Sequence, residues 1–358
     1  MRKRFIDNLR WMDVFLLIPY HAAQSFNTWG ELNYIYLKQN KAISSIIVFF
    51  SPFFMPLLFL LAGMSARYAL NKRSYGQYII ERIKRLMVPF VFGVLAFCPL
   101  LAYIGDLTNC AYKGSFGEHY KVFFTKWTDL TGFDGGFHVG QFWFLLYLFL
   151  ISLVSVGIIA SIKKISPNQD KAKNMPFGVI CLMVIPLPFL YDLLSVGGKS
   201  FAEYLYIFLI GHYVISDDIV IEKVQKYRLL TLMIGLIAGI ADVYMFIWSG
   251  KDFGTINVIA KALAEWFMIL ALIGIAKNRL DYKNKVSAYM TEMSFPYFSL
   301  HFLWIVLFQY WFADVLSSNT LLLFIIPILC AYAATIICSE ICRKVPVLRF
   351  LMGIKNKV

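Results

Sequence analysis

An arginine and a histidine near the N-terminus have the spacing of one helix face. Arg10 and His21 are eleven residues apart, and eleven steps of 100° make about three turns plus 20°. On a continuous helix the two side chains would lie on nearly the same side, about 16 Å apart along the axis. Pro19 lies between them and predicts a kink, which makes this alignment approximate.

His21 is a candidate proton-transfer residue. It follows the apolar run 14–18, and an ionisable side chain at membrane depth is costly unless it faces a polar cavity. Imidazole titrates near neutrality, so His21 could act as a catalytic base together with Arg10. Gln24 stands one turn further on and could hold or orient a substrate. The alternative is a histidine that packs between helices and bonds to a neighbour.

Basic residues form a second candidate site. Arg82 and Arg85 belong to the run ERIKR at 81–85, and Arg67 ends the apolar run before it. Together with Arg10 they could bind an anion, since guanidinium groups bind phosphates through paired hydrogen bonds. The alternative for each residue is ordinary cytoplasmic charge that contacts lipid head groups.

Two residues further along the chain could join the site. His301 lies in a late apolar run and could face the same polar cavity or pack between helices. Trp143 could bind substrate or belong to the core. The six cysteines form no CxxC pair, so we expect small buried thiols rather than a metal site. We expect no metal and no permanently bound cofactor.

The elements that position these side chains are transmembrane helices. Of the 358 residues 59% are hydrophobic and 15% are charged, whereas ordinary soluble domains carry roughly a quarter charged residues. A bilayer core about 30 Å thick requires about 20 apolar residues per helix. We therefore predict an all-α, polytopic integral membrane protein with about ten transmembrane helices. The predicted spans are 11–30, 43–70, 86–106, 140–162, 175–195, 201–216, 228–248, 255–277, 290–312 and 319–342.

Basic residues predict the orientation of these spans. Alternate segments between the spans, starting with the N-terminus, contain 25 Lys and Arg residues, and the other segments contain 7. Cytoplasmic segments carry the excess of positive charge, so both termini are predicted to be cytoplasmic, in the plasma membrane. These basic clusters account for the net charge of +13, so the charge does not indicate a nucleic-acid partner. The chain is predicted to be one transmembrane domain over residues 1–358.

Two segments between spans have opposite predicted sides. Segment 107–139, the longest, is predicted to face outside and contains a glycine cluster at 132–136 together with His119 and His138. Long ordered loops are often functional. The polar stretch Ser166–Asn174 is predicted to be a cytoplasmic linker.

Several motifs, in order, resemble the membrane acyltransferase-3 family. The segment Phe5–Arg10 followed by His21 is similar to its arginine–ten residues–histidine motif. The run RIKRL at 82–86, with Pro89, resembles its Arg-x-x-Arg motif. Further similar segments are Phe53–Met55 leading to Leu61–Gly63, Phe142–Leu145, and Tyr297–His301. The resemblance covers nearly the whole chain.

The sequence also departs from the family pattern. The Gly-x-Asp start of the second helix is replaced by Phe50-Ser51-Pro52, and no hydrolase-like or racemase domain follows the last span. This short form resembles the glucan-succinylating branch more than the O-antigen branch. The transferred acyl group therefore stays open between acetyl and succinyl.

The resemblance implies an O-acyltransferase that uses acyl-CoA as a co-substrate. Acyl-CoA would enter from the cytoplasm, and its phosphates would meet Arg82, Arg85 and Arg10. Arg67 belongs to the same candidate binding site for acyl-CoA. A hydroxyl of a glycan or other envelope acceptor would enter from outside, and His21 would act as general base or carry the acyl group. The alternative is a proton-coupled transporter or flippase for a polysaccharide or acidic metabolite, with His21 as a proton relay. Many transporters are built from two repeated halves, and the sequence shows no such repeat.

Overall fold

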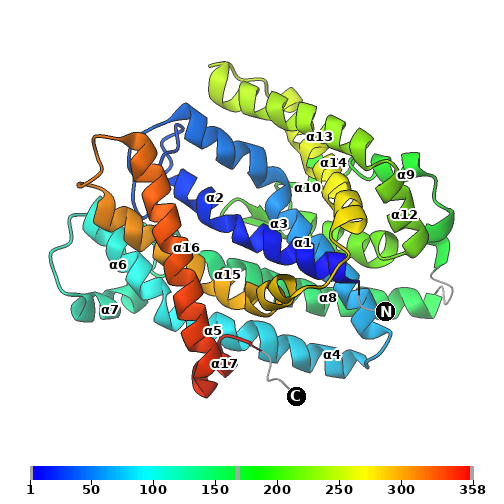
Figure 1. Cartoon of the computed structure of the whole chain (residues 1–358), viewed down its shortest axis with the longest axis horizontal. Coiled ribbons are helices and arrows are strands. Elements are labelled where there is room, and N and C mark those ends of the chain that lie inside the picture. The colour runs from blue at the N-terminus through cyan, green and yellow to red at the C-terminus, as the bar shows by residue number, and fades with distance from the viewer. Residues whose placement is uncertain (1–2, 166–169, 355–358) are drawn as a thin grey trace. The chain divides into compact units, whose positions relative to one another are not determined.

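The structure of the chain is a computed structural model that describes residues 3–165 and 170–354. Helices make up most of it (Figure 1). Strand β1 (Ser195–Val196) pairs antiparallel with β2 (Lys199–Ser200), and both residues between them, Gly197 and Gly198, have positive φ angles. This two-residue turn is the geometry that glycine adopts without steric cost. The predicted all-α class is confirmed.

The helices follow one another with few long connections. In chain order they are α1 (Arg4–Phe15), α2 (Leu17–Gln24), α3 (Lys41–Leu70), α4 (Tyr75–Arg82), the π-helix η1 (Ile83–Met87), α5 (Val88–Ala96), α6 (Cys98–Asn109), α7 (Phe116–Thr125), the 3-10 helix η2 (Gly140–Phe142), α8 (Trp143–Ile165), the 3-10 helix η3 (Asp170–Asn174), α9 (Phe177–Leu182), α10 (Leu187–Leu190), α11 (Phe201–Ile210), the π-helix η4 (Gly211–Ile215), α12 (Asp218–Lys226), α13 (Arg228–Val243), the π-helix η5 (Tyr244–Trp248), α14 (Thr255–Arg279), α15 (Lys285–Phe312), α16 (Thr320–Lys344) and α17 (Pro346–Leu351).

Six helical spans in the described part of the chain are long and apolar enough to cross a bilayer. They are Lys41–Leu70, Tyr75–Asn109, Gly140–Ile165, Arg228–Trp248, Thr255–Arg279 and Thr320–Lys344. A seventh is obtained if Phe201–Ile215 and Asp218–Lys226, which meet at 100°, form one broken span. The chain therefore has the helices of a multi-pass membrane protein. The count of ten and the cytoplasmic termini stay predictions.

Two of the other predicted spans, the first and the fifth, are interrupted for local reasons. The first is split between α1 and α2 next to Pro19, and the fifth contains the short helices α9 and α10, because Pro186 and Pro188 interrupt the helical hydrogen bonds. The ninth is the 28-residue helix α15, whose polar His301 and Gln309 lower its mean hydropathy. Of the predicted linker Ser166–Asn174, residues 166–169 lie outside the described residues, and the rest is η3.

The chain divides into two compact units, each built from three stretches of sequence. The first unit comprises Met1–Asp13, Val48–Ile83 and Tyr147–Thr291, and the second comprises Val14–Ile47, Lys84–Leu146 and Glu292–Val358. The prediction of one domain over residues 1–358 stays a prediction.

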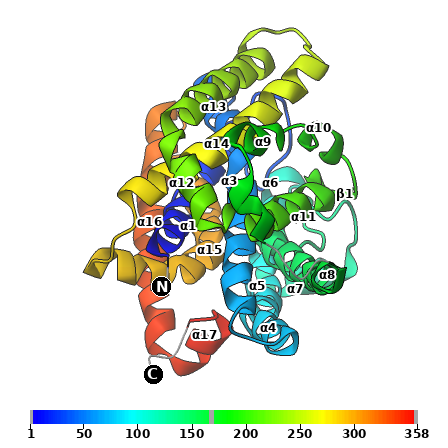
Figure 2. The ribbon, with the colours of Figure 1, turned by 90° about the vertical axis from the view of Figure 1, so that its right-hand side faces the viewer.

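Close helix contacts at glycines hold the first unit together. A Cβ atom on Gly63 of α3 would collide with the Phe208 carbonyl of α11, and one on Gly211 would collide with the Leu60 carbonyl. Small residues at a crossing let two backbones approach closely, which is how helices pack in lipid. Helices α13 and α14 run side by side (Figures 1 and 2), with Gly235 against Met268.

Polar side chains join α2 to α15 in the second unit. Gln309 Nε2 donates to the Ala22 carbonyl at 2.9 Å, and the Ser25 hydroxyl donates to Gln309 Oε1 at 2.9 Å. Both Ser25 and Gln309 are buried. Among apolar side chains, such hydrogen bonds connect two helices at one specific position. These bonds fix the register of α2, which carries His21, against α15, which carries His301.

Candidate functional site

Two imidazole rings meet inside the second unit. His21 on α2 and His301 on α15 are 280 residues apart in sequence, but their ring centroids lie 5.2 Å apart and their planes differ by 33°. The ring of Phe302 lies 4.5 Å from that of His21. Of the residues predicted for the site, His21, Gln24 and His301 are therefore brought together.

Hydrogen bonds determine which nitrogen of each ring can accept a proton. His21 Nδ1 lies 3.0 Å from Gln24 Oε1, and His301 Nδ1 lies 2.7 Å from the Phe298 carbonyl oxygen. Both oxygens are acceptors, so each neutral ring carries its proton on Nδ1 and its lone pair on Nε2. Gln24 contacts His21, and its predicted role in substrate binding stays a prediction. The pair therefore presents two Nε2 lone pairs in fixed tautomers.

A break in the first helix places His21. Pro19 has no N–H to give the Phe15 carbonyl, and α1 ends at Phe15 while α2 begins at Leu17. The kink predicted at Pro19 is thus present as a helix break. Tyr332 on α16 donates its hydroxyl to the Phe15 carbonyl at 2.8 Å.

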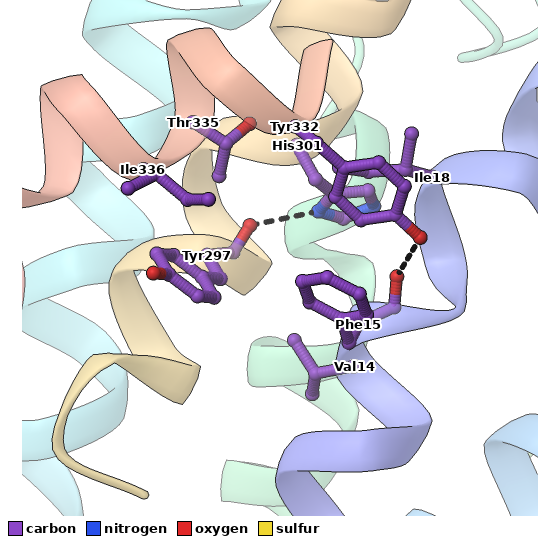
Figure 3. A pocket seen from close by; sticks show the side chains of 8 residues that line it. All are labelled: Val14, Phe15, Ile18, Tyr297, His301, Tyr332, Thr335 and Ile336. Atoms are coloured by element: carbon purple, nitrogen blue, oxygen red, sulfur yellow. Dashed lines mark hydrogen bonds between the residues drawn. The ribbon is translucent and has the colours of Figure 1, made fainter. Parts of the chain in front are cut away.

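A small pocket lies between the break, α15 and α16 (Figure 3). His301 forms part of its wall, as does Tyr332. The complete lining is Val14, Phe15, Ile18, Tyr297, His301, Tyr332, Thr335 and Ile336. Its free volume is about 10 Å³, which is the space for about one water-sized group.

The first unit contains a separate pocket that is rich in cations. Arg67, predicted for anion binding, lines it together with Arg73, Lys163 and His212. Its volume is about 250 Å³, and the remaining lining residues are Leu70, Asn71, Ser74, Tyr75 and Ile159. Arginine and lysine side chains around one cavity suit a phosphate-bearing ligand, because each can donate several charge-assisted hydrogen bonds.

The other predicted cations lie outside this pocket. Arg10 donates from Nη2 to Ser65 Oγ at 2.9 Å and pairs with Asp7 at 3.5 Å. The Arg82 guanidinium lies over the Tyr78 ring, 4.6 Å from its centroid.

Arg85 is exposed on the π-helix η1. A π-helical turn inserted into an α-helix is often found at functional sites. Arg10 belongs to the first unit and His21 to the second, so their predicted relation along one helix face stays a prediction.

Trp143 begins α8 and is linked to the histidines through aromatic rings. Its ring lies 6.3 Å from Phe144, which lies 5.5 Å from Phe298. Phe298 in turn lies 5.9 Å from His301. The predicted substrate-binding role of Trp143 stays a prediction.

Sequence reasoning missed several residues around both pockets. Tyr332 and Thr335 carry no motif, and they reach His301 through helix packing rather than sequence proximity. Lys163 of α8 and His212 of η4 line the cationic pocket, but in sequence they resemble ordinary residues at helix ends. In the described part of the chain, no group of three or more His, Cys, Asp or Glu side chains is arranged to hold a metal ion.

The segment 107–139 is ordered by two buried histidines. His119 Nε2 lies 3.0 Å from Asp106 Oδ2, and burial lowers the pKa of His119 although Asp106 opposes this shift. His138 donates from Nε2 to the Cys98 carbonyl at 3.0 Å, and its Nδ1 lies 2.9 Å from the Tyr34 hydroxyl oxygen. Burial lowers the pKa of His138 to about 4, so both histidines tie this segment to the helices in their neutral form.

Comparison with known proteins adds a family. A family model described as an acyltransferase domain, of the acyltransferase-3 type, matches residues 3–343. Similar curated proteins include the glucans biosynthesis protein C of Salmonella paratyphi B, 21% identical over 392 residues, and that of Salmonella typhimurium, 21% identical over 389 residues. Each alignment covers 100% of this chain and 96% of the relative. No solved structure matches the chain.

Proposed function

The chain belongs to the acyltransferase-3 family, and from this we propose that it transfers an acetyl or succinyl group from acyl-CoA to a hydroxyl of a glycan or other cell-envelope acceptor. The enzyme is a membrane acyltransferase, and the described residues contain six or seven helical spans suited to cross a bilayer. In this proposal acyl-CoA comes from the cytoplasm and the acceptor from the other side of the plasma membrane. Lipids surround the helices.

The paired imidazoles of His21 and His301 carry the proposal. Acyl transfer to a hydroxyl requires a group that takes up the hydroxyl proton or holds the acyl group on the way. His21 offers a basic Nε2, because its Nδ1 proton is held by Gln24 Oε1. Orienting the base through its second nitrogen is the arrangement found in hydrolytic triads. His21 is therefore the proposed catalytic residue, as general base or as acyl carrier.

The cationic pocket is the proposed site for the phosphates of the donor. Its volume of about 250 Å³ exceeds that of a phosphate group, so it could hold part of the nucleotide as well. Arg67 and Arg73 can each bind a phosphate group through two parallel hydrogen bonds. Arg82 and Arg85 remain proposed residues for binding the acyl donor. Arg10 remains a proposed catalytic partner of His21.

The acceptor class comes from the relatives. Proteins 21% identical to this chain are named for glucan biosynthesis, and we extend that class to this chain as a proposal. A glucan offers many hydroxyls and no better nucleophile. The acceptor is therefore proposed to be esterified at oxygen.

Release of free thiol from acyl-CoA tests the proposal. The full chain, purified in detergent, would be incubated with acetyl-CoA or succinyl-CoA and glucan oligosaccharides. Free CoA is expected to appear faster with the oligosaccharides than without them, and mass spectrometry is expected to find the acyl ester on the glycan. A transporter would leave the thioester intact. Intact donor in every mixture, from protein that still melts cooperatively, would contradict the proposed function.

A further inference from the structure

The pocket at the break of the first helix contains two buried polar atoms without a partner. His301 Nε2 and Thr335 Oγ1 have no hydrogen-bond partner among the described residues. The two residues are 1% and 2% exposed, and both line the pocket (Figure 3). Buried polar atoms are nearly always paired, and the rare exceptions often mark a functional role or a missing water. The two atoms therefore indicate a small ligand between α15 and α16.

The hydrogen-bonding capacity of the two atoms determines the chemistry of that ligand. His301 Nε2 can only accept, because the proton of the neutral ring is on Nδ1, bonded to the Phe298 carbonyl. Thr335 Oγ1 can donate its own proton. A ligand that satisfies both must therefore donate one hydrogen bond and accept another from a single small group. A hydroxyl group does both.

The size of the pocket excludes a larger ligand. A free volume of about 10 Å³ has space for one oxygen-sized group. A sugar ring or an acyl chain does not fit, whereas one hydroxyl at the edge of a larger molecule does. The rest of the wall is mainly aliphatic and aromatic, with Ile18 and Phe15 among its residues.

We propose that His301 Nε2 and Thr335 Oγ1 form a binding site for a single O–H group, next to His21. The inference rests on the proposed function where it takes that group to be the acceptor hydroxyl. A water molecule has the same chemistry and would make the site hydrolytic. His301 Nε2 thus accepts a hydrogen bond from the bound O–H group and Thr335 Oγ1 donates one to its oxygen, which holds that oxygen toward an acyl group carried by His21.

Thermal stability tests occupancy without reference to activity. Thr335→Val replaces the hydroxyl with a methyl group of nearly the same shape. The matched control is Ser339→Ala, because Ser339 Oγ on the same helix is also buried and unpartnered but does not line the pocket. Melting temperatures would be measured for the full chain with and without glucan oligosaccharides.

An occupied site predicts a lower melting temperature for Thr335→Val and not for Ser339→Ala. A decrease without oligosaccharide identifies water, and a decrease only with oligosaccharide identifies the acceptor hydroxyl. This measurement remains informative if the chain releases no CoA, so a failure of the proposed function is distinguishable from a failure of the site.

Activity then tests the role of the site. Thr335→Val and His301→Asn should reduce oligosaccharide-dependent CoA release by about tenfold each, the loss of one hydrogen bond. Thr335→Ser keeps the hydroxyl, and His301→Gln places an amide oxygen near the position of Nε2, so both should retain more activity. Equal reduction of hydrolysis and transfer assigns the site to both O–H sources. Wild-type melting temperatures and rates in Thr335→Val and His301→Asn would overturn the proposal.

Discussion

The Tyr332 hydroxyl donates a 2.8 Å hydrogen bond to the Phe15 carbonyl oxygen across 317 residues of sequence. That carbonyl is the one that would accept from residue 19 in an α-helix, and residue 19 is proline. A side chain of α16 thus replaces the N–H that the first helix lacks. The break that sets the direction of α2, and with it His21, is stabilised from outside the helix.

Tyr332→Phe should therefore destabilise the chain by about 1–3 kcal/mol, the cost of leaving a partly buried carbonyl without a partner. The measurement is thermal or denaturant melting of the purified protein. Pro19→Ala is the matched background, because alanine restores an N–H that can bond to Phe15. In that background Tyr332→Phe should lower the free energy of unfolding by less than it does in the wild type. The difference between the two effects should be at least about 0.5 kcal/mol. Additive effects would show that the tyrosine does not compensate for the proline.

The predicted topology can be checked with a native cysteine. Cys110 is exposed and lies in the segment 107–139, which is predicted to face outside. A membrane-impermeant maleimide should label it in intact cells. In a Cys110→Ala background, Lys173→Cys on η3 should be labelled only after the cells are permeabilised. Labelling of position 173 in intact cells would reverse the predicted sides and the side from which acyl-CoA enters.

Local features of the fold could be predicted from the sequence. Long apolar runs gave α3, α8, α14 and α16 with small errors at their ends, because bilayer thickness sets the length of such runs. Pro19 predicted the break in the first helix. Pro186 and Pro188 also stand in the fifth run, and they are the reason that this run is two short helices instead of one span.

The meeting of distant residues could not be predicted in the same way. His21 and His301 each stood out as ionisable groups in apolar runs, but their 5.2 Å approach depends on how α2 packs on α15. Gln309 fixes that packing, and no spacing in the sequence connects it to Ser25. Thr335 has no sequence signal, because only the empty space beside His301 gives its hydroxyl a role.

Stability should fall in mild acid because of His138. Its pKa is about 4 in the folded chain and about 6.5 in an unfolded chain. Between these values the unfolded state binds more protons, so stability is complete above pH 6.5 and is lost as the pH falls toward 4, by up to about 3 kcal/mol. Melting temperatures measured from pH 7 to pH 4 would check this.

The control for His138 is His138→Gln, which can still donate to the Cys98 carbonyl but does not titrate. It should flatten the pH dependence of melting. His119→Gln should reduce the pH dependence of melting by a smaller amount, because burial also lowers the pKa of His119. If the melting temperature of His138→Gln falls with pH as steeply as that of the wild type, the loss of stability in acid does not come from His138.

The cationic pocket should affect the KM of the acyl donor. Arg67→Ala and Arg73→Ala are each expected to raise the KM for acetyl-CoA by about tenfold or more, since a hydrogen bond to a charged group contributes about 1.5–3 kcal/mol. Lysine at either position should restore only part of this, because it lacks the paired donors of arginine. Arg82→Ala and Arg85→Ala should raise the KM in the same direction.

S-acetylpantetheine, which has no phosphate, separates phosphate binding from other effects. With this donor the arginine variants should equal the wild type. Arg279→Ala, an exposed cation at the end of α14, is the control for general loss of charge. Equal effects on both donors would mean that Arg67 and Arg73 support the fold or contact lipid.

His21 should be required for transfer and not for folding. His21→Ala is expected to bind acyl-CoA but to lose activity by about a hundredfold to ten-thousandfold, the usual effect of a lost general base, or more if the residue carries the acyl group. His21→Gln is the sharper variant, because it keeps a hydrogen-bonding amide and cannot take up a proton near neutral pH. Both variants should melt near the wild-type temperature, since Gln309 holds α2 on α15 independently of the imidazole. If His21 only packs between helices, the glutamine variant should transfer at a near-normal rate and the alanine variant should melt at a lower temperature. That outcome would remove His21 from the chemistry, whereas two inactive and stable variants would place it there.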